Sequence, residues 1–65
     1  MQRLYDGYKI DVAWCDDTLG FQFAVYDGDG KRVSGSLDPY CFEEYALMEA
    51  MRVVDTLNEN GGGEV

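Results

Sequence analysis

The order of hydrophobic and polar side chains predicts three β-strands in the first half of the chain. Residues 8–15 and 21–26 alternate strictly between two faces, and β-branched and aromatic side chains occupy one of these faces. Such alternation is typical of strands that are buried on one side only. Residues 31–37 form a weaker third strand, whose inner face we expect Val33 and Leu37 to mark. The inner positions of the first two strands are Tyr8, Ile10, Val12, Trp14, Phe21, Phe23 and Val25.

A helix is predicted after the strands, because the apolar period changes to 3.6 residues between about Tyr40 and Asn58. Asp38 is a favourable N-cap, and Pro39 suits the first helical position. A broad apolar stripe of the kind found here is typical of a helix that packs on a sheet. The residues of the stripe are Ala46, Leu47, Ala50, Met51, Val53, Val54 and Leu57.

Together these elements predict an α+β fold, in which a three-stranded antiparallel β-meander packs against one C-terminal α-helix. Short connections favour antiparallel neighbours, and the helix is expected to cover the apolar face of the sheet. The chain of 65 residues makes a single domain. We assign residues 1–60 to this domain, and we expect residues 61–65, which begin with three glycines, to form a flexible tail.

The segment VYDGDGKRVSG, residues 25–35, has two features of a calcium loop: paired aspartates and neighbouring glycines. An EF-hand loop needs oxygen ligands at its positions 1, 3, 5 and 12 and a glycine at position 6. If Gly30 is position 6, position 1 is Val25; if Asp27 is position 1, position 6 is Arg32. Both registers fail, whereas Asp-Gly between two alternating runs predicts a hairpin. We therefore expect a tight turn here and no metal site.

The composition argues against an enzyme and favours a protein partner. The chain has no histidine, so the Ser-His, Cys-His and His–metal arrangements are excluded. No glycine-rich loop opens a helix, a domain of this size has little room for a catalytic cleft, and we expect no cofactor. Thirteen Asp and Glu against five Lys and Arg give a net charge of −8. That charge repels nucleic acid and anionic membranes and attracts basic protein surfaces, although acidity alone also serves solubility.

The two cysteines, Cys15 and Cys41, lie far apart in the sequence. The N-terminal residues are polar, so no signal peptide is predicted, and we expect two free thiols in a reducing cytoplasm. The sequence alone also allows one disulfide between them. No apolar run approaches about 18 residues, so no membrane-spanning segment is predicted.

The predicted topology gathers acidic side chains at one end of the domain. The first turn, the end of the third strand and the start of the helix all lie there. We call this end the acidic tip, and its residues are Asp16, Asp17, Asp38, Glu43 and Glu44. The second turn, the chain start and the helix end lie at the opposite end, where we expect Arg3, Lys9, Lys31 and Arg32. Because like charges at one end cost free energy, we interpret the acidic tip, extended toward Glu49, as a surface for a basic groove; chance is the competing explanation.

Small size, strong acidity, this order of elements and the lack of a catalytic set resemble the small anti-CRISPR proteins of phages and other mobile elements. Among these, the chain is most similar to inhibitors of type I-C surveillance complexes. The resemblance implies an inhibitor in the cytoplasm of the bacterial host that imitates DNA, which carries about one negative charge per 1.7 Å of axis. It would occupy the basic target-DNA channel, which includes the large PAM-reading subunit. On this reading the side chains that stand in for phosphates are Asp16, Asp17, Asp38, Glu43, Glu44 and Glu49.

Two other readings do not require DNA mimicry. The protein can be a small accessory or antitoxin-like module that binds one protein through its helix or an edge of its sheet. Tyr26 is the contact candidate for this reading, because the alternation predicts that it faces away from the helix. A purely structural module that dimerises through the open sheet face is the third reading, although we expect a monomer.

Overall fold

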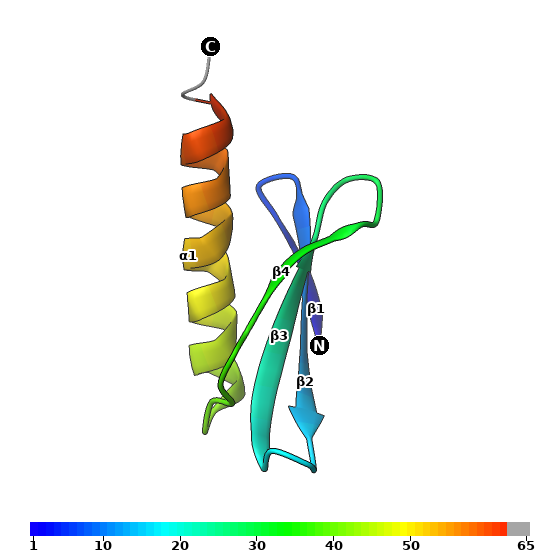
Figure 1. Ribbon diagram of the computed structural model, residues 1–65, viewed down its shortest axis with the longest axis vertical. Helices are drawn as coiled ribbons and strands as arrows, with labels where there is room; N and C mark the ends of the chain where they lie inside the picture. The colour runs from blue at the N-terminus through cyan, green and yellow to red at the C-terminus, as the bar shows by residue number, and fades with distance from the viewer. Residues whose placement is uncertain (63–65) are drawn as a thin grey trace.

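The computed structural model describes residues 1–62, in which a four-stranded antiparallel sheet is covered on one face by a single long helix (Figure 1). The strands lie side by side in sequence order, and each pairs with the next. The α+β class and the C-terminal helix are confirmed, but the sheet has four strands rather than three. The elements are β1 (Gln2–Tyr5), β2 (Tyr8–Cys15), β3 (Gly20–Tyr26), β4 (Arg32–Gly35) and α1 (Glu43–Gly62).

The additional strand, β1, is joined to β2 by a two-residue turn. Asp6 and Gly7 both have positive φ, 53° and 90°, and Tyr5 pairs directly with Tyr8. Two consecutive residues with positive φ match the right-handed twist of the flanking strands, and Asp-Gly is the favoured sequence for such a turn. The turn therefore folds the first residues back along β2 and makes β1 an edge strand.

The core lies between α1 and the inner face of β2 and β3. The alternation predicted for these two strands is confirmed, because their central inner positions are buried and pack against the apolar stripe of α1. No charged or polar residue is among the buried residues that the structure describes. The buried core consists of Ile10, Val12, Phe23, Val25, Ala46, Ala50 and Val54.

The inner face predicted for the third strand of the meander, now β4, is wrong. A bulge beside Val25 shifts the register, so that Ser34 rather than Val33 lies opposite Val25. Side chains directly opposite each other share a face, and a slip of one residue moves every side chain to the other face. Val33 is consequently 39% exposed and Leu37, beyond the end of the strand, is 95% exposed. Ser36 takes the inner position beside β3, where its hydroxyl accepts a hydrogen bond from the Phe23 N–H at 3.1 Å.

The helix begins later than the capping pattern predicts. Tyr40 is held by β3 instead, because its N–H and C=O each form a 2.8 Å hydrogen bond with the backbone of Phe21. Asp38 and Pro39 therefore belong to the link between β4 and α1, which follows the sheet before the helix starts at Glu43. Phe42 directly precedes the helix, and its C=O accepts hydrogen bonds from the N–H groups of Tyr45 and Ala46 at 3.1 and 3.3 Å.

The far end of α1 is joined to the turn between β1 and β2. The Tyr5 hydroxyl donates to Asp55 at 3.0 Å, and the Asn58 amide donates to the Asp6 carboxylate at 3.2 Å. The helix continues to Gly62 instead of ending near Asn58. Of the predicted tail, residues 61 and 62 form the end of α1, and residues 63–65 lie outside the described residues.

Candidate protein-binding surface

The five residues of the acidic tip lie at one end of the molecule. Asp16 and Asp17 form the turn between β2 and β3, Asp38 lies in the link, and Glu43 and Glu44 begin α1. These three segments meet because the link is paired to the start of β3 just before the helix begins (Figure 1). All five side chains are exposed. The topology thus brings together carboxylates from segments up to 28 positions apart in the sequence, counted from Asp16 to Glu44.

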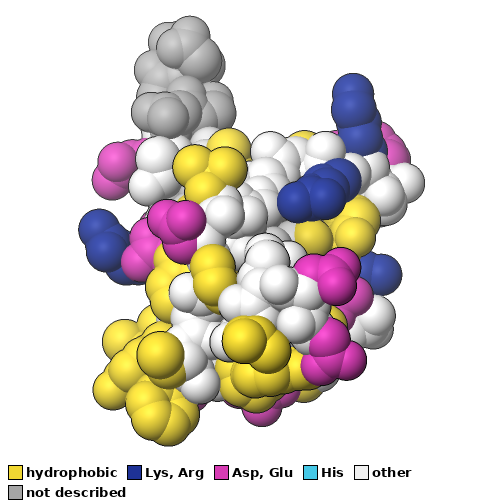
Figure 2. Space-filling view, turned by 60° about the horizontal axis from the view of Figure 1, so that its bottom comes forward, with side chains coloured by type: hydrophobic (Ala, Val, Ile, Leu, Met, Phe, Trp, Pro, Cys, Tyr) yellow, Lys and Arg dark blue, Asp and Glu magenta, His cyan; other side chains and the backbone are white. Residues whose placement is uncertain are grey.

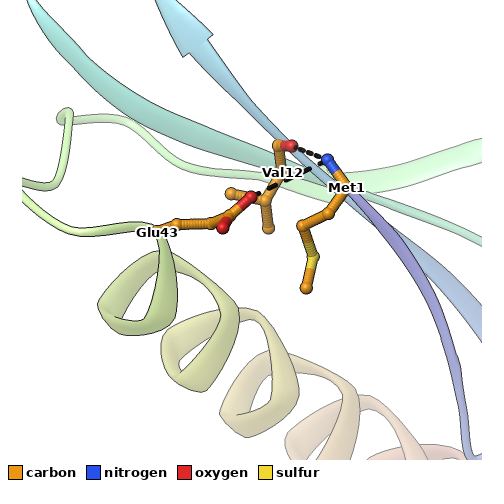
Figure 3. Close-up of polar contacts among 3 residues, drawn as sticks. All are labelled: Met1, Val12 and Glu43. Carbon is orange, nitrogen blue, oxygen red and sulfur yellow. Dashed lines mark hydrogen bonds and ion pairs between the residues drawn. The ribbon is translucent and has the colours of Figure 1, made fainter.

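One cation also lies at this end, contrary to the expected place of the chain start. The α-amino group of Met1 lies 3.9 Å from the Glu43 carboxylate and donates a 2.6 Å hydrogen bond to the Val12 carbonyl (Figure 3). The chain start was expected at the opposite end because β1 was not predicted. Since β1 runs antiparallel to β2, it places Met1 beside the second half of β2. The ammonium group of Met1 therefore compensates part of the negative charge of Glu43.

Glu49 lies one to two helical turns above the acidic tip and is paired with Arg52 at 3.3 Å. The Arg52 side chain is 79% exposed, and ion pairs of this kind contribute little to stability. Glu49, Asp38 and Tyr40 also line one open groove between α1 and the link. Burial, with the nearby charges of Glu49 and Asp38, raises the pKa of the Tyr40 hydroxyl.

Tyr26, the other predicted contact residue, is not part of the acidic tip. It lies at the opposite end of β3, on the face of the sheet that points away from α1, as the alternation predicts. Its neighbour across the strands is Lys9, whose ammonium group lies 5.3 Å from the centre of the Tyr26 ring. Such a contact between a cation and an aromatic face contributes about 0.5–1 kcal/mol at an exposed site.

Exposed hydrophobic side chains are the feature of this end that the sequence interpretation missed. Figure 2, which brings this end forward, shows hydrophobic groups in its lower part, with acidic side chains beside them and no Lys or Arg side chain among them. Trp14 was assigned to the core, but α1 begins too late to cover it, and its side chain is 51% exposed. The large exposed hydrophobic residues in the segments that form or adjoin the acidic tip are Trp14, Leu19, Leu37, Phe42, Tyr45 and Met48.

These hydrophobic side chains are interleaved with the carboxylates. The Trp14 ring packs edge-on against Phe21 at 5.2 Å between ring centres, while its indole N–H donates to the Asp16 carboxylate. Phe42 packs edge-on against Tyr45 at 5.3 Å, directly beside the two glutamates that open α1. We use the name acidic–aromatic surface for the acidic tip together with Trp14, Leu19, Phe42 and Tyr45. Leu19 in a polar turn and Phe42 outside the helical stripe were the signals in the sequence.

The backbone at Leu19 is unfavourable for stability alone. Its φ is 55°, which puts a leucine in the left-handed region, and its side chain is 76% exposed. A residue with a Cβ costs about 1–2 kcal/mol in this conformation, which glycine adopts freely. Leu19 therefore combines backbone strain with an apolar side chain in solvent, and residues of this kind cluster at functional sites.

The remaining chemistry of this region is limited. Cys15 and Cys41 are both free thiols. Hydrogen bonds from the Thr18 hydroxyl and from the Thr18 and Asp17 amides lower the pKa of the Cys15 thiol.

Within residues 1–62 the structure shows no cluster of three or more potential metal ligands, and no described helix is long and apolar enough to cross a membrane. Comparison with protein-family models, curated proteins and solved structures found no match to this chain.

Proposed function

We propose that the protein is a non-enzymatic inhibitor that binds a basic protein surface through its acidic–aromatic surface. Following the resemblance of the sequence, the target is the basic DNA channel of a type I-C surveillance complex, in the region of its large PAM-reading subunit. Bound there, the protein excludes target DNA. It acts in the cytoplasm of the bacterial host, as a monomer and without a cofactor.

The observation that supports this proposal most strongly is the coincidence of exposed carboxylates and exposed aromatic side chains at one end of the molecule. The carboxylates match a channel lined with Lys and Arg, and they accelerate association because opposite charges attract at long range. Large exposed hydrophobic groups are typical of interaction sites, and Trp and Tyr are enriched among the residues that dominate binding energy. The strained, exposed Leu19 is explained if a partner covers it.

The two kinds of side chain have different roles. Asp16, Asp17 and Glu44 compete with DNA phosphates for the basic groups of the channel. Trp14 and the Phe42–Tyr45 pair provide apolar contact area, which phosphates do not have. This combination gives the inhibitor a higher affinity than charge alone allows. Its affinity also depends less on salt than that of DNA, which falls steeply as ionic strength rises.

The proposal is tested by equilibrium competition on a purified type I-C surveillance complex. Fluorescently labelled duplex target DNA is bound to the complex, and the protein is added at several salt concentrations. We expect displacement of the DNA at a stoichiometry near one, and a weaker salt dependence for the protein than for the DNA. Binding of the protein without displacement of DNA would exclude the mimicry mechanism, and the absence of binding would exclude the target.

A second candidate function uses the other face of the sheet. α1 covers only one face, so Tyr26 and Lys9 are on an uncovered face, and β1 is an edge strand with Leu4 largely exposed. An edge strand can accept a strand from a partner through backbone hydrogen bonds. In this case Tyr26→Ala or Leu4→Ser would abolish binding, whereas charge changes at the acidic tip would have little effect.

A further inference from the structure

The groove between α1 and the link joins two carboxylates that are 11 positions apart in the sequence, Asp38 and Glu49. It encloses about 270 Å³ and is open to solvent. Its lining is mixed: Phe23, Leu37 and Val53 contribute apolar side chains, Tyr40 an aromatic ring, and Ser36 and the two carboxylates polar groups. A groove that combines apolar side chains with two carboxylates fits a side chain with an aliphatic stem and a cationic end.

We propose that this groove binds a single arginine side chain of the protein partner. The inference rests on the proposed function and specifies how one part of that surface recognises its target. The aliphatic part of the arginine lies against Phe23 and Val53, and the guanidinium group lies between Asp38 and Glu49. Arginine fits better than lysine because its planar guanidinium stacks on an aromatic ring and donates to two carboxylates at once.

Two independent observations point to this ligand. Glu49 and Asp38 line the same groove, and the charges of both raise the pKa of the Tyr40 hydroxyl, which Arg52 lowers in part. The protein's own Arg52 already places a guanidinium nitrogen 3.3 Å from a Glu49 oxygen, which shows that this carboxylate is accessible to such a group. The Arg52 side chain is 79% exposed, and among the described residues its ion pair is with Glu49, so a second guanidinium can enter from the link side.

The intramolecular pair also predicts how the site is modulated. While Arg52 is bound to Glu49, it compensates part of the charge that attracts an incoming arginine. Replacing Arg52 by an uncharged residue of similar length removes this competitor and leaves both carboxylates in place. We therefore expect Arg52→Gln to bind an arginine ligand about twofold more tightly than the unmodified protein, which is within the range of exposed ion pairs.

The test is a titration followed by amide chemical shifts, with the peptide acetyl-Gly-Arg-Gly-amide as the probe. The expected result is saturable shifts at Asp38, Tyr40 and Glu49, weaker binding by the lysine peptide and none by the citrulline peptide, which has the same shape without the charge. The double variant Asp38→Asn/Glu49→Gln should lose about fivefold in affinity or more. The matched control, Asp29→Asn/Glu59→Gln, changes the net charge equally outside the groove and should lose less than twofold.

Three results would overturn the inference: no shifts in the groove, equal shifts with the citrulline peptide, or an equal loss in the control variant. The last of these would show general attraction to an acidic protein. If the double variant fails to fold, the comparison of arginine and citrulline peptides on the unmodified protein still decides the question. Because the surveillance complex is absent from this experiment, its outcome is independent of whether that complex is the target.

Discussion

A methyl group added at Gly20 should destabilise the protein by displacing the link that carries Asp38. A Cβ at this position would lie 2.5 Å from the Pro39 Cβ and 3.1 Å from the Tyr40 carbonyl oxygen. A Cβ essentially never lies within 3.0 Å of a non-bonded heavy atom, so either β3 or the link must move. Gly20 does not have a positive φ, and the expected effect of Gly20→Ala is therefore steric.

The size of the effect follows from two opposing contributions. Replacing glycine by alanine where the backbone allows it stabilises by about 0.4–1 kcal/mol, because the unfolded chain loses freedom. Overpacking costs about 1–3 kcal/mol. If the link moves instead, the two hydrogen bonds between Tyr40 and Phe21 are lost, at about 0.5–1.5 kcal/mol each. Both routes lead to a net destabilisation of about 1–2 kcal/mol for Gly20→Ala.

The matched control is Gly28→Ala in the turn between β3 and β4, where an added Cβ meets no atom within 4 Å. The assay is urea unfolding followed by the fluorescence of the single tryptophan, Trp14, supported by the melting temperature. In a domain of this size, 1 kcal/mol corresponds to about 4–8 °C. Gly28→Ala should be neutral or slightly stabilising. If Gly20→Ala is as stable as Gly28→Ala, the link does not pack against β3 and the groove described above does not exist.

The remaining predictions concern the sheet and the helix end. Val25→Ala should lower the free energy of unfolding by roughly 1–3 kcal/mol because this side chain is fully buried. Val33→Ala should change it by no more than about 0.5 kcal/mol, because Val33 is exposed. Equal losses would contradict the bulge in β4. The hydrogen bond to Asp55, with partial burial, raises the pKa of the Tyr5 hydroxyl in the folded state above the ordinary value for tyrosine, about 10. The associated stability is complete below that value and decreases as the pH rises through the folded-state pKa, so Tyr5→Phe should flatten the alkaline loss measured by unfolding. An unchanged alkaline slope would show that this hydroxyl is not held by the helix.

The pattern of the sequence predicts the centre of this fold well and its edges poorly. β2 and β3 were predicted because their alternation reflects burial on one face. β1 was missed because none of its four side chains is fully buried, although Asp6-Gly7 is the same Asp-Gly hairpin sequence that was recognised at residues 27–28. In β4, the bulge reverses the inner face, and a bulge leaves little trace in a strand with one valine.

The binding surface, like the fold, was predicted from the sequence only in part. The prediction that the five acids gather at one end requires only the knowledge of which end each turn occupies. This follows from the antiparallel order of the strands. The exposure of Trp14 could not be predicted, because it depends on where α1 starts. Local capping preference would start the helix near Pro39, but the two backbone hydrogen bonds between Tyr40 and Phe21 extend the link to Glu43. The meeting of Asp38 and Glu49 in one groove has the same cause.

The most direct test of the central claim compares charge reversal at the two ends of the molecule. Asp16→Lys/Asp17→Lys changes the acidic tip, and Asp29→Lys/Glu59→Lys makes the same change in net charge at the opposite end. All four side chains are exposed, so both variants should fold normally, and circular dichroism checks this. Measured as displacement of target DNA from the type I-C complex, the tip variant should lose at least tenfold in potency and the control variant less than threefold, if each of the two reversed side chains of the tip is worth about 1 kcal/mol or more at the interface. Equal potency of the two variants would contradict the account.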